Sequence, residues 1–227
     1  DSVKGRGYAL KTPLHLLDEK IINRQLNTKS VSLHIQESVD STNSYLKTIT
    51  PTKKIGVCLA EEQTIGRGRL KNDWYSPFGD NIYCSIRFPL EKDLSELSGL
   101  SLCIGCIVAD VLGPLVPDGA IELKWPNDVY LDGKKLAGIL IEIQAEAHGL
   151  CSVIIGVGIN VNMSLKNTPK KRITQPWLSL QEATGDYHDR NIIAAHLIDA
   201  LIDGVALFSS QGFLAYMERW DQRDYLK

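Results

Sequence analysis

The stretch Val129-Tyr-Leu-Asp-Gly-Lys-Lys-Leu-Ala-Gly-Ile-Leu-Ile-Glu142 decides the class of fold. Its Asp132-Gly133 pair lies between two apolar runs, which is a strong sequence signal of a β-hairpin. Another run, Ile121 to Trp125, precedes the hairpin, and Cys151 to Val161 follows it after a second turn near His148. We therefore expect strands on both sides of this turn.

More strands and helices are expected outside this region. Val31, Leu33 and Ile35 alternate with polar residues, which is the period of a half-buried strand. Thr12-Pro13 and the cluster Asp40-Ser41-Thr42-Asn43 are helix-start signals. The apolar spacing predicts strands over 56–63 and 81–88, and helices over 12–26, from 42, over 95–112 and over 192–208. Together these elements predict an α+β domain, a mixed β-sheet packed with helices.

The composition is that of an ordinary globular protein. The chain has 227 residues, 44% of them apolar and 23% charged, and a formal net charge of -2. This balance argues against a protein that binds nucleic acid over its whole surface, because such binding normally needs a basic domain. The most apolar segment, Leu100 to Val116, is interrupted by polar residues, glycine and proline, so we expect a buried helix and no membrane span.

The cysteines and the start of the chain favour a reducing, cytoplasmic location. Five cysteines is an odd number for a disulfide framework. Cys103 and Cys106 lie in an apolar helical run without the four ligands of a zinc site, so we expect buried, reduced thiols. The chain starts at Asp1 without a signal-peptide pattern, which indicates a processed or trimmed polypeptide.

The polar loop after the strand over 56–63 combines glycine with arginine. Its sequence is Gln63-Thr-Ile-Gly66-Arg67-Gly68-Arg69-Leu-Lys71. Glycine lets backbone amides approach an anion, and arginine can bind a carboxylate or a phosphate with two hydrogen bonds. The spacing matches neither the P-loop nor the dinucleotide-binding fingerprint. These residues alone leave open both an anion-binding loop and a solvated basic turn.

Three other polar sites fall at ends of predicted strands or inside them. Lys124-Trp-Pro-Asn127-Asp128 is either a plain turn or a set that holds Mg²⁺ and a phosphate, because Mg²⁺ favours carboxylates together with substrate oxygens. Lys135 lies at the mouth of an apolar strand, where an exposed hairpin lysine is the plainer interpretation. Gly156 and Gly158 weaken a strand unless a ligand or another backbone approaches closely.

Taken in order, these motifs resemble a known family, the bacterial biotin protein ligases. The motifs that carry the resemblance are Asp40 to Asn43, Gln63 to Arg69, Lys124 to Asp128, Lys135 to Glu142 and Gly156 to Asn160. Their order and spacing make the resemblance far more specific than any single motif, and it covers about Leu14 to Trp220. It implies the catalytic fold of biotin and lipoate ligases, which is similar to class II aminoacyl-tRNA synthetases.

The resemblance also implies a division of the chain. Residues 11–220 correspond to the ligase catalytic domain. Residues 1–10 are similar to the tail of the N-terminal winged-helix domain through which some family members repress the biotin operon. Residues 221–227 are similar to the start of a linker toward a C-terminal β-barrel domain. Contact with DNA is therefore expected only through a winged-helix domain that this segment lacks.

The family's reaction defines the expected substrates and partners. Biotin and ATP give biotinyl-5′-adenylate and pyrophosphate with Mg²⁺ as activator, and biotin then passes to a lysine of the biotin carboxyl carrier protein of acetyl-CoA carboxylase. A carboxylate must attack an α-phosphate, so cations are needed where negative charge builds up. The resemblance implies a cytoplasmic enzyme without a membrane partner. A homodimer and a repressor role are left open.

Site residues carry over from the family residue by residue. Those that match catalytic positions are Arg69, Lys135 and Asp128, and Asp128 is also the candidate Mg²⁺ ligand or the group that acts on the incoming lysine. Those that match the biotin site are Ser41, Thr42, Asn43, Gln63, Gly66, Arg67, Gly68, Arg69, Lys135, Gly138, Gly156 and Gly158. Those on the nucleotide side are Trp74, Lys124, Asn127 and Asn160.

One departure from the family changes an expectation. The family loop usually has a second Gly-Arg before the tryptophan, where this chain has Lys71 and Asn72. Lys71 supplies a charge without the bidentate fork of arginine, so we expect a different grip on the ATP phosphates. Two alternatives to a biotin ligase are a lipoate–protein ligase, which shares the fold and the two-step logic, and a biotin-sensing regulator with a decayed catalytic site.

Overall fold

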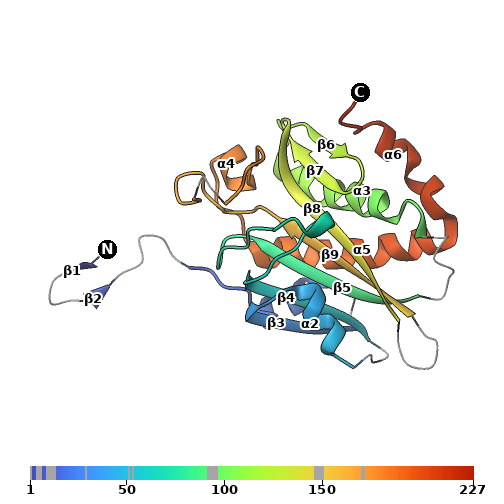
Figure 1. The fold of residues 1–227 in the computed structure, drawn as a ribbon, viewed down its shortest axis with the longest axis horizontal. Helices are drawn as coiled ribbons and strands as arrows, with labels where there is room; N and C mark the ends of the chain where they lie inside the picture. The colour runs from blue at the N-terminus through green and yellow to red at the C-terminus, as the bar shows by residue number, and fades with distance from the viewer. Residues whose placement is uncertain are drawn as a thin grey trace.

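The computed structural model describes residues 2–3, 7–8, 14–28, 30–50, 52, 54–90, 97–145, 151–169 and 172–227. Its centre is a seven-stranded sheet packed with helices (Figure 1). In sheet order the strands are β3 Val31–Val39, β4 Ile55–Gln63, β5 Ile82–Leu90, β9 Cys151–Ile159, β8 Lys134–Ala145, β7 Asp128–Leu131 and β6 Ile121–Lys124. Strands β3 and β4 are parallel and the other neighbours are antiparallel, so the expected mixed sheet is confirmed.

The predicted hairpin joins β7 to β8. Asp132 and Gly133 link the two strands with φ angles of 49° and 71°. Positive φ at both turn residues fits the twist of antiparallel strands, and glycine adopts it without a steric penalty. The next pair, β8 and β9, is antiparallel in a register that places Gly138 beside Gly158. The predicted turn at His148 lies outside the described residues.

Two helices cover one face of the sheet. They are α3 (Leu100–Leu112) and α5 (Arg190–Gln211), which lie behind the sheet in Figure 1. Val153, Ile155 and Val157 of β9 belong to this apolar layer. By length and composition alone the helical stretch Arg190–Asp221 could cross a membrane, but 56% of its apolar window is buried inside the protein. This burial is what a core helix requires.

The opposite face of the sheet carries only one short helix, α2 (Thr42–Thr48), among the described residues. Leu46 of this helix packs against Cys58 and Ile154 in a small separate cluster. Its N-cap is Ser41, whose hydroxyl accepts from the backbone N–H of Ser44 at 3.5 Å, as the capping cluster predicted. Most of this face is therefore left open.

The thiols of α3 are buried as expected. Cys103 and Cys106 are both free and fully enclosed. Burial raises the pKa of Cys103 to about 12 and that of Cys106 to about 11. The prediction that these two thiols are buried in the core is confirmed.

The ends of the chain differ from expectation. The first helix, α1, runs from Glu19 to Gln25 and starts later than predicted, because the Asp18 side chain caps it by accepting from two backbone N–H groups. Thr12 and Pro13 lie outside the described residues. Within residues 1–10, β1 (Ser2–Val3) pairs with β2 (Gly7–Tyr8). The assignment of this segment to a winged-helix domain stays a prediction.

The last residues pack along the edge of the sheet. After the short helix α6 (Met217–Asp221), the backbone N–H of Leu123 donates to the carbonyl oxygen of Arg223 at 2.6 Å. The N–H of Tyr225 donates to the Leu123 carbonyl at 3.1 Å. The segment that was predicted to begin a linker therefore lies against β6 in this structure.

A buried ion pair joins four segments of the chain. Arg190, the first residue of α5, places a guanidinium nitrogen 2.8 Å from a carboxylate oxygen of Glu61, and the two side chains are 1% and 4% exposed. Arg190 also donates to the carbonyl oxygens of Asn81 (3.1 Å) and His15 (2.8 Å). Glu61 accepts from the backbone N–H of Leu17. The pair therefore holds the chain before α1 and the start of α5 to the end of β4.

We expect Arg190→Met to lower the free energy of unfolding by about 3–5 kcal/mol, because it leaves the Glu61 carboxylate buried without its partner. Urea unfolding followed by circular dichroism would measure the loss. Arg24→Met, at an exposed position of α1, is the control and should change stability by less than about 0.5 kcal/mol. A loss at Arg190 no larger than that of the control would contradict this role.

Candidate active site

The open face of the sheet carries three glycines that lie close together. Ser85 of β5 pairs with Gly156 of β9, and Tyr83 of β5 pairs with Gly158. Gly138 of β8 pairs with Gly158 from the other side. Side chains alternate between the two faces of a strand, so these glycines lie opposite the layer formed by α3 and α5. They form the floor of a cavity of about 730 Å³.

This cavity gathers most of the predicted site residues. Its walls come from the N-terminus of α2, the loop after β4, the turn between β6 and β7, and residues 172–177. The predicted residues that line it are Ser41, Thr42, Asn43, Gln63, Arg67, Gly68, Arg69, Trp74, Asn127, Asp128, Lys135, Gly138, Gly156, Gly158 and Asn160. Two predicted residues, Gly66 and Lys124, are described but do not line it.

Hydrogen bonds fix the polar side chains of one wall. Gln63 Oε1 accepts from the backbone N–H of Thr42 at 2.9 Å. Thr42 Oγ1 lies 2.7 Å from Ser85 Oγ, which in turn lies 2.6 Å from Asn43 Oδ1. Thr42, Asn43 and Ser85 are all buried. The wall therefore presents hydroxyl and amide groups in set positions. Ser85 was not predicted, because it lies within an apolar strand and belongs to no motif.

Asn43 lies directly over Gly156. A Cβ atom on Gly156 would be 2.5 Å from Asn43 Oδ1, so only glycine lets α2 approach the sheet this closely. Arg87 of β5 holds the other end of α2, donating to the carbonyl oxygens of Leu46 (2.9 Å) and Ile49 (2.6 Å). A helix of seven residues is not stable alone, so these contacts position its N-terminal residues.

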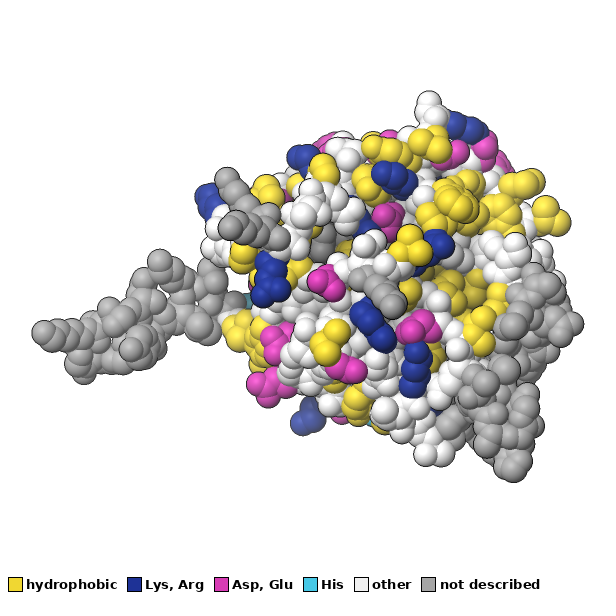
Figure 2. Space-filling model, in the orientation of Figure 1, with side chains coloured by type: hydrophobic (Ala, Val, Ile, Leu, Met, Phe, Trp, Pro, Cys, Tyr) yellow, Lys and Arg dark blue, Asp and Glu magenta, His cyan; other side chains and the backbone are white. Residues whose placement is uncertain are grey.

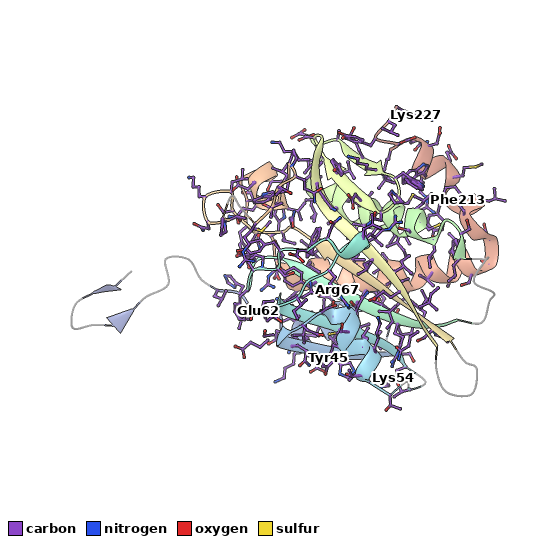
Figure 3. All side chains as sticks on the ribbon, in the orientation of Figure 1. Tyr45, Lys54, Glu62, Arg67, Phe213 and Lys227 are labelled. Carbon is purple, nitrogen blue, oxygen red and sulfur yellow. The ribbon has the colours of Figure 1, made fainter. Side chains whose placement is uncertain are left out.

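The glycine-arginine loop lies across the mouth of the cavity. Arg67 donates to Ser44 Oγ at 2.8 Å, and Figure 3 shows Arg67 next to α2. Arg69 begins a short turn, η1 (Arg69–Lys71), and is exposed. Within the described part of the chain Arg69 makes no ion pair, so its charge is available to a ligand. Gly66 is buried beneath the loop, where a Cβ atom would collide with the carbonyl oxygen of Trp74.

The Trp74 indole lies on two glycines of the floor. A Cβ atom on Gly158 would be 2.6 Å from Trp74 Cε2, and one on Gly138 would be 3.0 Å from Cζ3. The indole N–H is buried and has no hydrogen-bond partner among the described residues. The family resemblance assigns both glycines to the biotin site. In this structure Trp74 occupies the space above them, just as Asn43 occupies the space above Gly156.

Lys135 and Asp128 form an ion pair at the edge of the floor. Lys135 Nζ lies 2.8 Å from Asp128 Oδ1, and the side chains are 13% and 19% exposed. Lys135 Nζ also lies 5.4 Å from the centroid of the Trp74 ring. Asp128 is placed by its pairing with Gly138 across β7 and β8. A cation and a carboxylate thus face the cavity together, beside the indole.

Asn127 and Asn160 build the wall between these elements. The Asn127 side chain donates to the carbonyl oxygen of Ile139 at 2.9 Å. The Asn160 side chain donates to the carbonyl oxygens of Leu178 (3.2 Å) and Lys135 (3.3 Å). Both residues line the cavity, but their amide groups connect segments of the chain. A contact of either residue with a nucleotide stays a prediction.

Lys124 was predicted on the nucleotide side, but the structure places its side chain elsewhere. Its Nζ lies 4.9 Å from the centroid of the Tyr130 ring and 5.1 Å from that of Tyr225. It also lies 3.3 Å from the Tyr130 hydroxyl. The two rings attract the ammonium group through cation–π contacts, which hold it beside the C-terminal segment. The structure gives no support for a nucleotide role of Lys124.

The residues present do not fit a resident magnesium ion. The described part of the chain contains no group of three or more His, Cys, Asp or Glu side chains that could hold a metal. Asp128, the candidate ligand, is already ion-paired with Lys135. Mg²⁺ in phosphate-transfer sites is bound largely by substrate oxygens and water. Any Mg²⁺ used here would arrive with the nucleotide as part of the substrate.

Residues 172–177 form a wall of the cavity. Arg172 and Trp177 both line it. Trp177 forms a bridge with Lys135, whose backbone N–H donates to the carbonyl oxygen of Pro176 at 3.1 Å. The only sequence signal was a Pro-Trp pair in a polar stretch. The return of this loop to β8 is a tertiary contact that no local pattern predicts.

The cavity carries an excess of positive charge. Its described basic residues are Arg67, Arg69, Lys135 and Arg172, and its acidic ones are Asp73 and Asp128. Elsewhere on the face drawn in Figure 2, basic and acidic side chains lie next to one another. The near-neutral balance of the whole chain is therefore compatible with a local site for anions.

Comparisons with known proteins agree with this geometry. Residues 35–160 match the model of the biotin/lipoate A/B protein ligase family. The bifunctional ligase/repressor BirA of Escherichia coli is 42% identical over 224 residues, which cover 98% of this chain and 68% of that protein. The biotin–[acetyl-CoA-carboxylase] ligase of Paracoccus denitrificans is 30% identical over 80% of this chain and 76% of that protein.

A solved structure has the same architecture. Biotin protein ligase from Aquifex aeolicus, in complex with biotin and ATP, matches with a TM-score of 0.70 and 29% identity, over 86% of this chain and 78% of that one. The seven-stranded sheet and its cavity thus define a ligase catalytic domain. The chain belongs to the biotin/lipoate A/B protein ligase family. Its relatives over most of its length are biotin protein ligases, so the protein is a ligase enzyme.

We expect Gly158→Ala to lower the free energy of unfolding by about 1–3 kcal/mol, because the added methyl group would overlap the Trp74 ring. Denaturant unfolding followed by circular dichroism would measure this. Gly113→Ala is the matched control, since a Cβ atom added there would meet nothing within 4 Å and the φ of Gly113 is -52°. If the two variants lost the same stability, the indole would not pack on Gly158 in solution.

Proposed function

We propose that this protein is an ATP-dependent biotin ligase that forms biotinyl-5′-adenylate and then transfers biotin to a protein lysine. One observation carries the proposal: a single cavity combines a wall of fixed hydroxyl and amide groups with basic side chains beside a glycine floor. The Aquifex aeolicus ligase is in complex with biotin and ATP, and that of Leishmania major with biotinyl-5-AMP. Both support the assignment of biotin and ATP as substrates.

The polar wall is assigned to the ureido ring of biotin. That group offers one carbonyl acceptor and two N–H donors, so its site needs both donors and acceptors. Thr42, Asn43 and Gln63 supply hydroxyl and amide groups of both kinds, held in place by their bonds to one another and to Ser85. Burial of this wall favours a ligand that replaces water with matched hydrogen bonds.

The first chemical step joins two anions. A biotin carboxylate oxygen attacks the α-phosphorus of ATP, the bond to the bridging oxygen breaks, and pyrophosphate leaves with the electron pair. Cations that meet the developing charge lower the barrier. Arg69 makes no ion pair among the described residues, and Lys135 faces the cavity while Asp128 holds it. We assign both cations to this step.

Arg172 could replace the arginine that related loops carry at the position of Asn72. Asn72 stands where related loops carry an arginine, and Arg172 lines the same cavity as Asn72. Arg172 is exposed, and among the described residues it makes no ion pair. We therefore assign Arg172 to the ATP phosphates, in place of the missing arginine. Trp74 and Trp177 line the cavity as well and offer flat faces to the adenine.

The second step transfers biotin to an amine. The lysine nitrogen attacks the adenylate carbonyl carbon, AMP leaves, and the nitrogen loses a proton; Asp128 is the candidate acceptor of that proton. The name of the Paracoccus denitrificans relative supports the carrier domain of acetyl-CoA carboxylase as the acceptor. We place the reaction in the cytoplasm. Homodimer formation, and DNA contact through a winged-helix domain, remain predictions of the family resemblance.

The proposal is tested by supplying the purified protein with biotin, ATP and Mg²⁺ and measuring pyrophosphate and biotinyl-adenylate. Formation of both products is expected. No product from folded protein would leave only a biotin-sensing role. Thermal unfolding with biotin or with lipoate distinguishes a biotin ligase from a lipoate–protein ligase, because a ligand stabilises the fold that it binds. Stronger stabilisation by lipoate would indicate a lipoate–protein ligase.

We expect Lys135→Met to slow adenylate formation about 100-fold, because it removes a preorganised charge from the reacting phosphate. Single-turnover measurement of biotinyl-adenylate would show the effect. Lys134→Met is the matched control, since Lys134 is the exposed neighbour on the same strand. Equal rates for the two variants would remove Lys135 from the reaction.

A further inference from the structure

Glu142 is an acidic residue of β8 that no step above uses. It is two residues beyond Leu140 on the strand, so both lie on the open face of the sheet with α2 and the cavity. Its side chain is 24% exposed. The apolar sequence around Glu142 did not indicate whether it faces solvent or the site. The structure turns it toward α2.

Three polar groups converge on the Glu142 carboxylate. Lys47 Nζ lies 2.8 Å from Oε1, and the Asn43 side chain donates to Oε2 at 2.8 Å. Arg67 lies 3.9 Å from Oε2. Burial alone would raise the pKa of Glu142, but hydrogen bonds from Lys47 and Asn43 and the charges of Lys47 and Arg67 hold it below its ordinary value. Glu142 is thus a carboxylate at neutral pH.

This contact determines which way the Asn43 amide points. Its Nδ2 donates to Glu142 and to the carbonyl oxygen of Leu140 at 3.3 Å, which uses both hydrogens. Its Oδ1 lies 2.6 Å from the Ser85 hydroxyl and above Gly156. An amide oxygen has two lone pairs, so one remains for a ligand. A carboxylate cannot donate, and therefore the reversed amide would place two acceptors against each other.

We propose that Glu142 is a positioning residue that holds Asn43 with its amide oxygen toward the cavity, where an N–H of the biotin ureido group donates to it. This inference rests on the proposed function, because it needs biotin in the cavity. It assigns Glu142 to recognition of the ureido ring, through Asn43, and not to the chemistry of ATP. Glu142 would then govern affinity for biotin and leave the affinity for ATP unchanged.

A different role for Glu142 would be to anchor α2 as a whole. Its ion pair with Lys47 lies one helical turn beyond Asn43, and Gln144 of the same strand donates to the Lys47 carbonyl at 3.2 Å. An anchoring role predicts that loss of Lys47 does the same damage as loss of Glu142. If Glu142 acts through Asn43, loss of Lys47 should change the affinity for biotin very little.

Titration calorimetry with biotin alone would test the proposal on the full chain. We expect Glu142→Ala to weaken biotin binding about tenfold, as expected for loss of a charge-assisted contact. Glu142→Gln should recover most of the affinity, because its amide oxygen can still accept from Asn43. Lys47→Met should change the affinity less than about twofold, as is usual for an ion pair that solvent still reaches, since the two side chains are 33% and 24% exposed.

The double variant Asn43→Ala/Glu142→Ala gives the deciding result. If Glu142 acts through Asn43, the double variant should bind biotin no more weakly than the single variant Asn43→Ala. Losses that multiply in the double variant, or a loss in Lys47→Met equal to that in Glu142→Ala, would overturn the inference. Circular dichroism of each variant confirms that it is folded. A wild-type chain that fails to bind biotin would instead overturn the proposed function.

Discussion

The alternation of side chains along β9 is the constraint on which the rest of the structure depends. Val153, Ile155 and Val157 must point into the layer of α3 and α5, because all three belong to the apolar core and their burial stabilises the fold. Gly156 and Gly158 then face the other side. A slip of one residue would bury the glycines and expose the three apolar side chains, so the apolar face of the sheet fixes the floor of the site.

The floor in turn determines what can lie above it. Because Gly156 has no side chain, α2 can approach the sheet. Its first residues, Thr42 and Asn43, then form hydrogen bonds with Gln63 and Ser85. Because Gly158 has none, the indole of Trp74 can lie flat beside Lys135. The polar wall and the basic side chains are thus brought to one cavity by the same strand. The proposed binding of biotin and the proposed stabilisation of charge would therefore both depend on glycines, which have no functional group of their own.

Local signals predicted the parts of the molecule that local interactions form. The hairpin at Asp132 and the N-cap at Ser41 were found because each depends on a few adjacent residues. The contact of Lys124 with Tyr225 could not be predicted, because Tyr225 comes from the distant end of the chain. Ser85 and Arg172 were missed because an apolar strand and a polar loop give no hint of what packs across them. Most predicted site residues nevertheless meet in one cavity, since the family motifs carry that long-range information.

The Arg190–Glu61 pair has a consequence for how the molecule is made. Its two members are separated by more than half the chain, so the contact has a high sequence separation. Proteins are synthesised from the N-terminus, and β4 leaves the ribosome long before α5 does. Until α5 has been synthesised, the Glu61 carboxylate has no guanidinium partner, and burying it would be unfavourable. We therefore expect this end of β4 to stay hydrated until the start of α5 has been synthesised.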